Sequence, residues 1–435
     1  MDSRDRLESI RRAVSSLEAE LTALSDAIWA HPETAFQEEY ACAALSRFLA
    51  EKGFSVESSA AGLPTAFVAS RGAGSPVIGF LGEYDALPGL YQPAGVSETG
   101  DEPGTAGHGC GHNLLGTGAA GAAAALSGYL EKNRLPGTVR FYGCPAEESG
   151  AGKEILARSG VFDGLDACFT WHPETRNCVV TQSTLANIIA EAEFHGKASH
   201  AAASPELGRS ALDACELMNV GANYLREHVP PDVRFHYAYT DAGGSSPNIV
   251  QSKASLLYYI RAEKQRTAED VLARLSDIAK GAALMTGTEV SFRRGSTMSD
   301  YRSNDALGRL ADEAFRQLGA PEFSPEEIAS AARFSAEVPP FSAGIEPYRL
   351  RTGALSVSTD VGNVSHIVPT VQIYVACFAK GTPFHDRRMT AQAALPAAHR
   401  GMMTAAAVLA AAGVAAAESP EVLAAASAEL RDTEK

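Results

Sequence analysis

The chain has 435 residues, of which 45% are hydrophobic, and a formal net charge of −15 at pH 7. This length exceeds what one hydrophobic core usually organises, so we expect two domains. The acidic balance argues against nucleic acids and membranes as partners and favours a small-molecule substrate. The seven cysteines are scattered and odd in number, which is typical of reduced thiols in a cytoplasm. No run of 18 apolar residues and no secretory pattern occurs, so we predict a cytoplasmic protein.

The N-terminal part alternates between helical and strand patterns. Apolar residues from Leu7 to Ile28 recur at spacings of three and four, which predicts one amphipathic helix ending before His31. The patterns that follow are a helix at about 38–52, strands at 66–69 and 77–82, a helix at 114–129 and a strand at 138–144. This order predicts βαβ units and a sheet with parallel strands.

From about residue 184 the pattern changes to β-α-β-β-α-β. Its elements are expected at 188–194, 208–228, 233–241, 255–261, 268–286 and 289–293. Such a unit forms a ferredoxin-like domain, and its insertion would leave 1–183 and 300–435 as one discontinuous domain, with 184–299 as the second. An Ala-rich stretch at 396–417 predicts a closing helix, and we expect the polar tail after 418 to be partly disordered or a frayed helix.

Side chains that bind metals recur where strands are expected to end. They are Cys110 and His112 in a glycine-flanked loop, the adjacent Glu147 and Glu148, and His172. The carboxyl ends of strands in an open α/β sheet meet at one edge, so these motifs can converge. A thiolate, imidazoles and a carboxylate suit a borderline divalent metal, and a second carboxylate can deprotonate a bound water. The residues therefore predict a hydrolytic metal site, with one glutamate as ligand and its neighbour as base.

Seven short motifs stand in order along nearly the whole chain. They are GEYDALPG at 82–89, GCGHNLLG at 109–116, PAEE at 145–148, WHP at 171–173, GRSALDA at 208–214, STDVG at 358–362 and GTPFH at 381–385. Together they resemble the aminoacylase and carboxypeptidase-type metallopeptidase family, closest to its p-aminobenzoyl-glutamate hydrolase branch. The resemblance implies an α/β fold: a zinc-peptidase-like catalytic domain with helices on both faces of a mixed sheet. It also implies that the inserted ferredoxin-like domain is a lid that pairs subunits.

The resemblance further implies a divalent transition metal, one or two ions per subunit. Its ligands would be Cys110, His112, Glu148, His172 and His385. Glu147 would then be the general base and acid, which agrees with the chemistry of a carboxylate beside a metal-bound water. We favour Mn or Zn as the metal, with Co or Ni as alternatives.

The lid contributes further residues by resemblance. His200 matches a lid histidine that, in the family, reaches the partner subunit's site and stabilises developing negative charge. Asn248 and Arg261 match lid positions near the substrate. A homo-oligomer, either a dimer or dimer-based, is therefore implied. Asp85 and Asp360 could accept hydrogen bonds from ligand histidines.

Some residues depart from the pattern of the branch. Asn363 and His366 stand where relatives usually have an Asp and a Trp, and Gln251-Ser252 replaces a usual Pro and Asp. The residues Phe384 and Asp386 around His385 also differ from the common context. These changes leave the metal set intact and alter residues expected to line the substrate pocket.

We therefore predict a metal-dependent hydrolase of a C–N bond in a small carboxylated, aromatic substrate, with metal-bound hydroxide as nucleophile and Glu147 as proton shuttle. An alternative with the same residues is removal of an amino group from an electron-poor aromatic ring, such as a nitroanthranilate, by aromatic substitution. An alternative of another class is a non-catalytic partner or binding subunit. The intact set of ligand-type residues argues against that last alternative.

Overall fold

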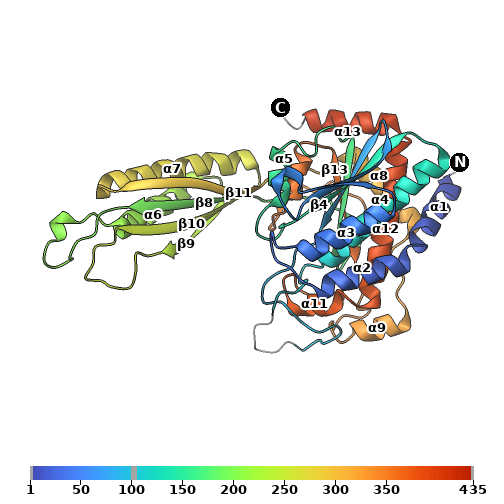
Figure 1. The fold of residues 1–435 in the computed structure, drawn as a ribbon, viewed down its shortest axis with the longest axis horizontal. Coiled ribbons are helices and arrows are strands. Elements are labelled where there is room, and N and C mark those ends of the chain that lie inside the picture. The colour runs from blue at the N-terminus through green and yellow to red at the C-terminus, as the bar shows by residue number, and fades with distance from the viewer. Residues whose placement is uncertain (1–2, 99–104, 433–435) are drawn as a thin grey trace. The chain divides into compact units, whose positions relative to one another are not determined.

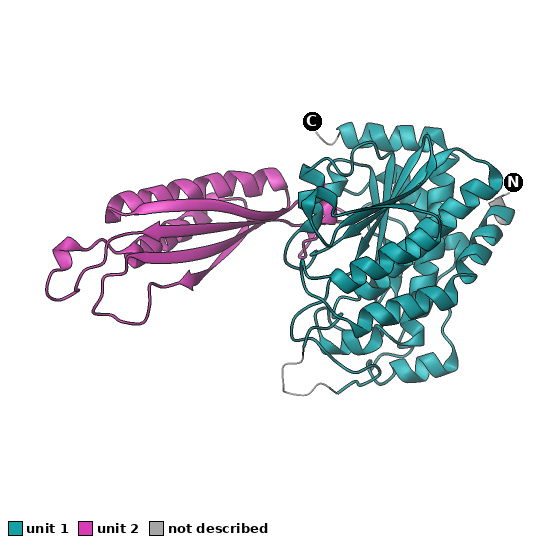
Figure 2. Cartoon of the chain, viewed as in Figure 1, with its two compact units in different colours: residues 1–182, 302–351, 364–435 teal, residues 183–301, 352–363 magenta. Residues whose placement is uncertain are grey.

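The structure is a computed structural model that describes residues 3–98 and 105–432. It divides the chain into two compact units (Figure 2). Unit 1 comprises Met1–Gln182, Arg302–Arg351 and Val364–Lys435, and unit 2 comprises Ser183–Tyr301 and Thr352–Asn363. The domain boundaries expected at 183/184 and 299/300 stay a prediction, and in this division 352–363 belongs to unit 2 rather than to unit 1.

Unit 1 is built on a seven-stranded mixed sheet with the order β1-β2-β4-β3-β5-β13-β6. The strands are β1 Ser55–Ser58, β2 Phe67–Ala73, β3 Val77–Glu83, β4 Gly137–Cys144, β5 Ala167–Glu174, β6 Cys178–Val179 and β13 Thr370–Ala376. The neighbours β4, β3, β5 and β13 run parallel, whereas β1, β2 and β6 pair antiparallel. The predicted α/β fold with a mixed sheet is confirmed.

Helices surround this sheet (Figure 1). They are α1 Ser3–Ser15, α2 Glu18–Ala30, α3 Glu39–Glu51, α4 His112–Asn133, α5 Gly152–Arg158, α8 Asp305–Leu318, α9 Pro325–Ala331, α11 Arg387–Gln392, α12 Pro396–Ala417 and α13 Pro420–Asp432, with a short α10 at Val361–Ser365. Helices α4 and α12 pack against each other and against the central strands. They form the centre of the hydrophobic core.

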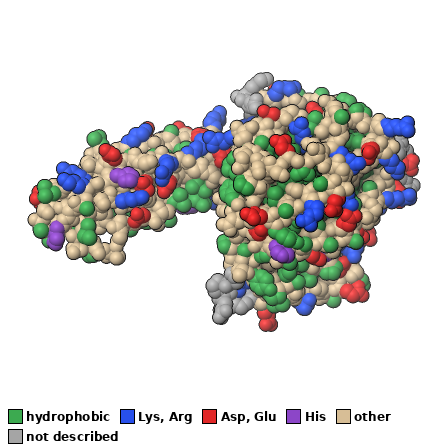
Figure 3. Space-filling model, viewed as in Figure 1, with side chains coloured by type: hydrophobic (Ala, Val, Ile, Leu, Met, Phe, Trp, Pro, Cys, Tyr) green, Lys and Arg blue, Asp and Glu red, His purple; other side chains and the backbone are tan. Residues whose placement is uncertain are grey.

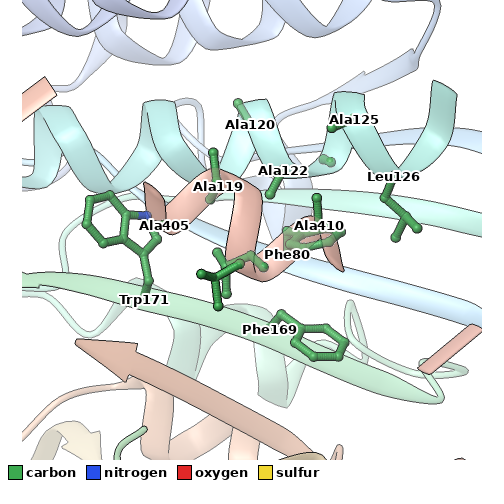
Figure 4. Close-up of a cluster of buried hydrophobic side chains, with 14 of the residues drawn as sticks. Phe80, Ala119, Ala120, Ala122, Ala125, Leu126, Phe169, Trp171, Ala405 and Ala410 are labelled. Carbon is green, nitrogen blue, oxygen red and sulfur yellow. The ribbon is translucent and has the colours of Figure 1, made fainter. Parts of the chain in front are cut away.

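Small residues let α4 approach the sheet closely (Figure 4). A Cβ atom at Gly116 would lie 2.6 Å from the carbonyl oxygen of Glu83, and one at Gly118 would lie 2.8 Å from the ring of Trp171. The indole Nε1 of Trp171 donates a hydrogen bond to the Leu115 carbonyl at 3.0 Å, which ties β5 to the first turns of α4. The glycines weaken the helix locally, but they bring its N-terminus against the strand ends.

Helix α12 is long and apolar enough to cross a membrane by length and composition alone. However, 72% of its most apolar window is buried inside the protein. Its small side chains pack against α4, α8 and the strands. We therefore describe α12 as a core helix.

The N-terminal segment forms two helices, so the prediction of a single helix was wrong. Helix α1 ends at Ser15 and α2 begins at Glu18. The hydroxyl of Ser16 donates to the Ala13 carbonyl at 2.7 Å, and the backbone N–H of Leu17 bonds to Val14 rather than continuing the α-helical ladder. Serine hydroxyls compete with the helix for backbone groups in this way.

The expected partly disordered or frayed tail is instead a helix of 13 residues, α13. The carboxylate of Glu429 accepts hydrogen bonds from the backbone of Asp305 at 2.8 and 2.9 Å, at the start of α8. The amide of Asn304 donates to the Ala426 carbonyl at 2.9 Å. A carboxylate at a helix N-terminus is favourable, so α13 and α8 stabilise each other.

Unit 2 has the predicted β-α-β-β-α-β order, which confirms the ferredoxin-like pattern. Its elements are β8 Ala186–His195, α6 Ala211–Leu225, β9 Arg234–Asp241, β10 Lys253–Ala262, α7 Gln265–Thr286 and β11 Glu289–Met298. The four strands are antiparallel in the order β11-β8-β10-β9, and both helices pack on the sheet. The segment 352–363 adds a short strand β12, Ala354–Leu355, which pairs with β7, Ser183–Thr184. On the face drawn in Figure 3, acidic and basic side chains are interspersed.

The α4–α12 contact makes a quantitative prediction. Leu126 of α4 is fully buried, and its side chain lies against the backbone of Gly413 in α12. Truncating Leu126→Ala should therefore lower the free energy of unfolding by about 2–5 kcal/mol, because it leaves a cavity between two core helices. The matched control is Leu350→Ala in the same unit, where Leu350 is 58% exposed and the expected change is within about 0.5 kcal/mol. Urea denaturation measures both, and equal effects of the two substitutions would contradict the assigned core.

Candidate metal centre

The candidate metal centre lies at the edge of unit 1 where the parallel strands β3, β4, β5 and β13 end. Loops that follow parallel strands meet at one edge of a sheet. The six ligand-type residues are Cys110 and His112 around the start of α4, Glu147 and Glu148 after β4, His172 in β5 and His385 after β13. The structure brings these separate motifs together in overlapping groups whose ligand atoms lie within 4.8 Å of one another.

A glycine turn directs Cys110 and His112 into the site. Gly111 has φ +75°, and a Cβ atom there would lie 2.8 Å from the side chain of Pro173. Any other residue at this position would therefore be strained and would also collide with β5. The turn ends at His112, the first residue of α4, whose side chain is fully buried.

Asp85 determines which nitrogen of His112 faces the site. The Nδ1 atom of His112 lies 2.8 Å from the Asp85 carboxylate, the contact expected of a partner to a ligand histidine. A neutral imidazole that donates from Nδ1 presents a lone pair at Nε2, the form that binds a metal. The other carboxylate oxygen of Asp85 accepts a hydrogen bond from the backbone N–H of Glu148 at 2.9 Å.

His172 and Cys110 face each other across the site. His172 lies within β5, two residues before its end, and not beyond the strand as expected, because β5 continues to pair with β13 through Glu174. Its Nδ1 bonds to the Pro173 carbonyl at 2.8 Å, which leaves Nε2 at 3.4 Å from the Cys110 sulfur. The fixed tautomer again presents a lone pair to the site.

Glu148 contacts His385 from the opposite side. One Glu148 oxygen lies 3.1 Å from His385 Nε2, and the other lies 4.0 Å from His112 Nε2. Burial opposes ionisation of Glu148, but the hydrogen bond from His385 and the charge of His112 lower its pKa to about 2. Glu148 is therefore an anionic donor across the physiological pH range.

The donor atoms fit a bound metal ion. Among the described residues, His112 Nε2 and Glu148 Oε1 are buried and make no hydrogen bond. Buried polar atoms without partners are rare and costly, so their convergence indicates a missing cation. Burial and the charge of Glu148 raise the pKa of the Cys110 thiol well above its ordinary value. A divalent ion would reverse that effect by stabilising the thiolate.

Glu147 lies beside this donor set. Together with Glu83 and His112 it forms a group in which one ligand atom from each residue lies within 4.8 Å of the others. Ala146, directly before it, has φ +58°, a conformation that non-glycine residues seldom adopt. Such strained turns mark sites where the direction of a side chain matters.

Three buried charged residues near the site were not predicted from the sequence. Glu83 is 2% exposed, and its Oε1 lies 2.6 Å from the ammonium of Lys153, which is completely buried. Burial opposes ionisation of Glu83, but Lys153 lowers its pKa below the ordinary value. Glu38 is fully buried at the start of α3. Only Glu83 stands in a recognised motif, directly before Tyr84-Asp85, and that position was the available signal.

Glu38 supports the loop that carries the two glutamates. Its Oε1 accepts hydrogen bonds from the backbone N–H of Ala146 at 2.9 Å and of Phe36 at 3.0 Å. It therefore links the N-terminal loop to the strained residue before Glu147. Burial, together with the nearby charge of Asp85, raises the pKa of Glu38 to about 7.

The lid residues lie at two different ends of the unit 2 sheet. His200 and Asn248 are neighbours, since Ala201 donates to the Asn248 carbonyl at 2.9 Å, and both are exposed. Their loops adjoin the end of β10 that begins at Lys253. Arg261 lies eight residues further along β10, which corresponds to about 26 Å at 3.3 Å per residue. The structure therefore does not bring Arg261 together with His200 and Asn248 in unit 2.

The departures from the branch pattern have different surroundings. The side chain of Asn363 accepts from the Ser299 backbone at 3.2 Å and donates to the Thr297 carbonyl at 3.1 Å. Asn363 therefore holds the end of β11 in place, which is a structural role. Phe384, in contrast, is 43% exposed, and its ring centre lies 5.6 Å from that of His172. Phe384 thus forms an apolar wall beside the candidate metal centre.

Arg261 and Asp360 both belong to unit 2. The guanidinium of Arg261 donates to the Ser358 hydroxyl at 3.1 Å, within that unit. Asp360 is fully buried in the same segment as Ser358, directly before α10. The role suggested for Asp360 beside a ligand histidine stays a prediction.

The environment of Glu38 predicts a pH dependence. Its folded pKa of about 7 exceeds the ordinary value of 4.5, so folding favours the protonated form and stability falls as pH rises from about 4.5 through 7. In metal-free protein, Glu38→Gln should remove up to about 3 kcal/mol of this fall. Urea denaturation at pH 5 and pH 8 measures it. Glu39→Gln, at an exposed neighbour, should keep the wild-type slope, and a Glu38→Gln protein with that same slope would contradict the assignment.

Comparisons with known proteins agree with this site. The model of peptidase family M20/M25/M40 matches residues 79–380. One of the two subunit types of the p-aminobenzoyl-glutamate hydrolase of Escherichia coli K12 is 44% identical over 88% of this chain and 85% of that protein. Solved structures share the fold: an aminobenzoyl-glutamate utilization protein from Klebsiella pneumoniae (TM-score 0.64, 17% identity, 92% and 97% of the two chains) and a dinuclear metal-binding M20 peptidase from Bacillus subtilis (TM-score 0.61, 19% identity, 93% and 99%). The chain therefore belongs to peptidase family M20/M25/M40 and is a hydrolase that acts on C–N bonds.

Proposed function

We propose that this chain is a metal-dependent amidohydrolase that cleaves the C–N bond of a small carboxylated aromatic substrate, with Glu147 as general base and acid. One observation carries the proposal. Buried donor atoms of His112 and Glu148 that lack hydrogen-bond partners among the described residues converge with Cys110 and His385, and Glu147 lies beside them. This arrangement combines a cation site with a carboxylate that can move a proton.

The ion would be held by residues that the fold already orients. Its ligands would be Cys110, His112, Glu148, His172 and His385. A bound divalent cation lowers the pKa of water and polarises the scissile carbonyl group. Mn or Zn fits this mixed sulfur, nitrogen and oxygen donor set, and Co or Ni are the alternatives.

Glu147 would transfer the proton in both halves of the reaction. It accepts a proton from the attacking water as the water oxygen bonds to the carbonyl carbon. It then gives that proton to the amide nitrogen as the C–N bond breaks, so that a carboxylic acid and an amine leave. The positive φ of Ala146 and the hydrogen bond from Ala146 to Glu38 would hold this side chain in place.

The surroundings of the centre support an aromatic substrate. The exposed ring of Phe384 beside His172 offers a surface on which an aromatic acyl group can pack. The relative with 44% identity is named for hydrolysis of p-aminobenzoyl-glutamate, an aroyl amino acid. We therefore propose amides between an aromatic acid and an amino acid as the substrate class, and we place the enzyme in the cytoplasm.

The positions of the lid residues support a homodimer. About 26 Å of strand separates Arg261 from the end of the sheet near His200, too far for both side chains to contact one small substrate. If both act, one must come from a second copy. The ring of His200 accepts hydrogen bonds at Nδ1 from the N–H groups of Ala202 and Ala203, so Nε2 carries the proton and can donate to a developing negative charge. Asn248, on the neighbouring loop, would contact the substrate with it.

Replacing the proposed base tests the mechanism. Glu147→Gln keeps the shape of the side chain but removes its basicity, so kcat should fall by about 10²–10⁴-fold while metal content stays unchanged. Glu148→Gln should instead reduce metal content, because it neutralises a ligand. Activity with Mn or Zn and metal analysis separate the two effects. A Glu147→Gln enzyme with near wild-type kcat would overturn the assignment of the base.

Product analysis tests the reaction class. Metal-loaded enzyme is incubated with N-acyl amino acids, p-aminobenzoyl-glutamate and electron-poor anthranilates, and products are identified by mass spectrometry. Release of an amino acid supports the proposal. Ammonia with a hydroxylated ring would show aromatic substitution instead, and inactivity of a fully metal-loaded protein across the panel would favour a binding subunit.

Mixing two inactive variants tests the lid histidine. If His200 acts on the partner's site, dimers of a His200→Ala subunit with a Glu147→Gln subunit contain one complete site. Random reassembly of a symmetric dimer should then restore about a quarter of wild-type activity. If His200 acted within its own chain, no activity would return, and a His200→Ala enzyme with full kcat would remove this residue from the mechanism. Sedimentation of the pure protein checks that the chain forms a homodimer without a second type of subunit.

A further inference from the structure

The strand-end residue Glu83 and the helix residue Lys153 form an ion pair beneath the candidate metal centre. Glu83 ends β3 and Lys153 lies in the first turn of α5, and their charged atoms are 2.6 Å apart with almost no exposure to solvent. Removing two charges from water is costly, and such a pair seldom stabilises a fold by itself. A buried pair at this position therefore calls for another reason to be there.

The second oxygen of Glu83 supplies that reason. Lys153 contacts Oε1, whereas Oε2 lies 3.3 Å from Nε2 of His112. This nitrogen makes no hydrogen bond among the described residues, because the geometry toward Glu83 does not satisfy one, and its Nδ1 already pairs with Asp85. A carboxylate oxygen and an imidazole lone pair at this distance repel each other. A cation bound to both atoms would remove the repulsion and satisfy both groups.

The charge of the cluster points to more than one ion. The acidic groups are Glu83, Asp85, Cys110, Glu147 and Glu148, and Lys153 is the buried cation among them. With every acid ionised, five negative charges and one positive charge leave a net charge of about −4, which two divalent cations would neutralise. The ligand atoms also form overlapping groups: one contains Cys110, Glu148 and His385, and another contains Glu83, His112 and Glu147.

From these contacts we infer that Glu83 is a further metal ligand, which binds the ion on the His112 side through Oε2 while Lys153 holds Oε1 in place. The inference rests on the proposed metal-dependent function and adds a carboxylate to its ligand set. Lys153 acts as a positioning residue: it fixes the carboxylate so that one oxygen remains directed at His112. Neither residue would exchange protons with the substrate.

Metal binding without substrate tests this inference. Metal-free protein is titrated with Mn²⁺ and with Zn²⁺ by calorimetry, and bound metal is counted after gel filtration. Glu83→Gln keeps the size of the side chain but places a weaker donor at Oε2, so one ion should bind at least about tenfold more weakly than in wild type. The matched control is Glu154→Gln, at a buried position adjacent to Lys153, where the carboxylate pairs with Arg158 at 3.2 Å and wild-type binding is expected.

A second variant keeps the test decisive if Glu83→Gln does not fold. Lys153→Met removes the counter-charge but leaves Glu83 as a ligand, so the metal-free protein should be less stable than wild type while the rise in Tm on metal addition should be larger. A purely structural ion pair predicts that Lys153→Met lowers Tm equally with and without metal. Circular dichroism of each metal-free variant checks folding.

The outcomes separate this inference from the proposed function. If the wild-type protein binds no divalent metal, the proposed function itself fails. If wild type binds metal but Glu83→Gln matches it in stoichiometry and affinity, the metal-dependent function stands and the role of Glu83 is overturned. A tenfold loss in Glu83→Gln that is absent from Glu154→Gln supports Glu83 as a ligand, whatever the substrate proves to be.

Discussion

The geometry of the metal centre depends on one buried carboxylate, that of Asp85. One of its oxygens lies 2.8 Å from Nδ1 of His112, and the other accepts the backbone N–H of Glu148 at 2.9 Å. The side chain thus connects three segments: the loop after β3, the start of α4 and the loop after β4. It fixes the tautomer of His112 and the direction of the chain at Glu148 together. Water does not compete for a group that is 1% exposed, so both contacts are strongly preferred.

Much of the fold and the centre could be predicted because the signals are local. The elements of unit 2 follow hydrophobic periodicity, and the cysteine, histidine and glutamate motifs stand at strand ends, where an α/β sheet places its sites. Buried charges could not be predicted in this way. Glu38 and Lys153 look like surface residues in the sequence, since their burial depends on Ala146 and Glu83, which are distant or lie on another element. Nothing in the segment around Lys153 distinguishes it from a solvated lysine.

Two further differences came from geometry that periodicity does not contain. Val14, Leu17 and Leu21 keep spacings of three and four across the junction between α1 and α2, so the apolar stripe continues through a break in the backbone. In unit 2, the resemblance to the family placed His200 and Arg261 near the substrate, but only the pairing of β10 with β8 shows that a strand length separates them. Strand register thus turned two apparently equivalent lid residues into residues that need two copies of the chain to meet.

The energetics of unit 1 explain why its core and its centre belong together. Unpaired buried donors and the Glu83–Lys153 pair raise the free energy of the metal-free fold, because each keeps a polar group away from water without full compensation. The Ala-rich contact between α4 and α12 and the strands beneath it must offset that cost, and α4 itself begins at His112. An ion that binds only the folded form returns part of the energy, about 2.7 kcal/mol when its concentration is a hundred times Kd. Metal affinity and unfolding free energy are therefore linked in this protein, so a ligand substitution that weakens metal binding should reduce stability only when metal is present.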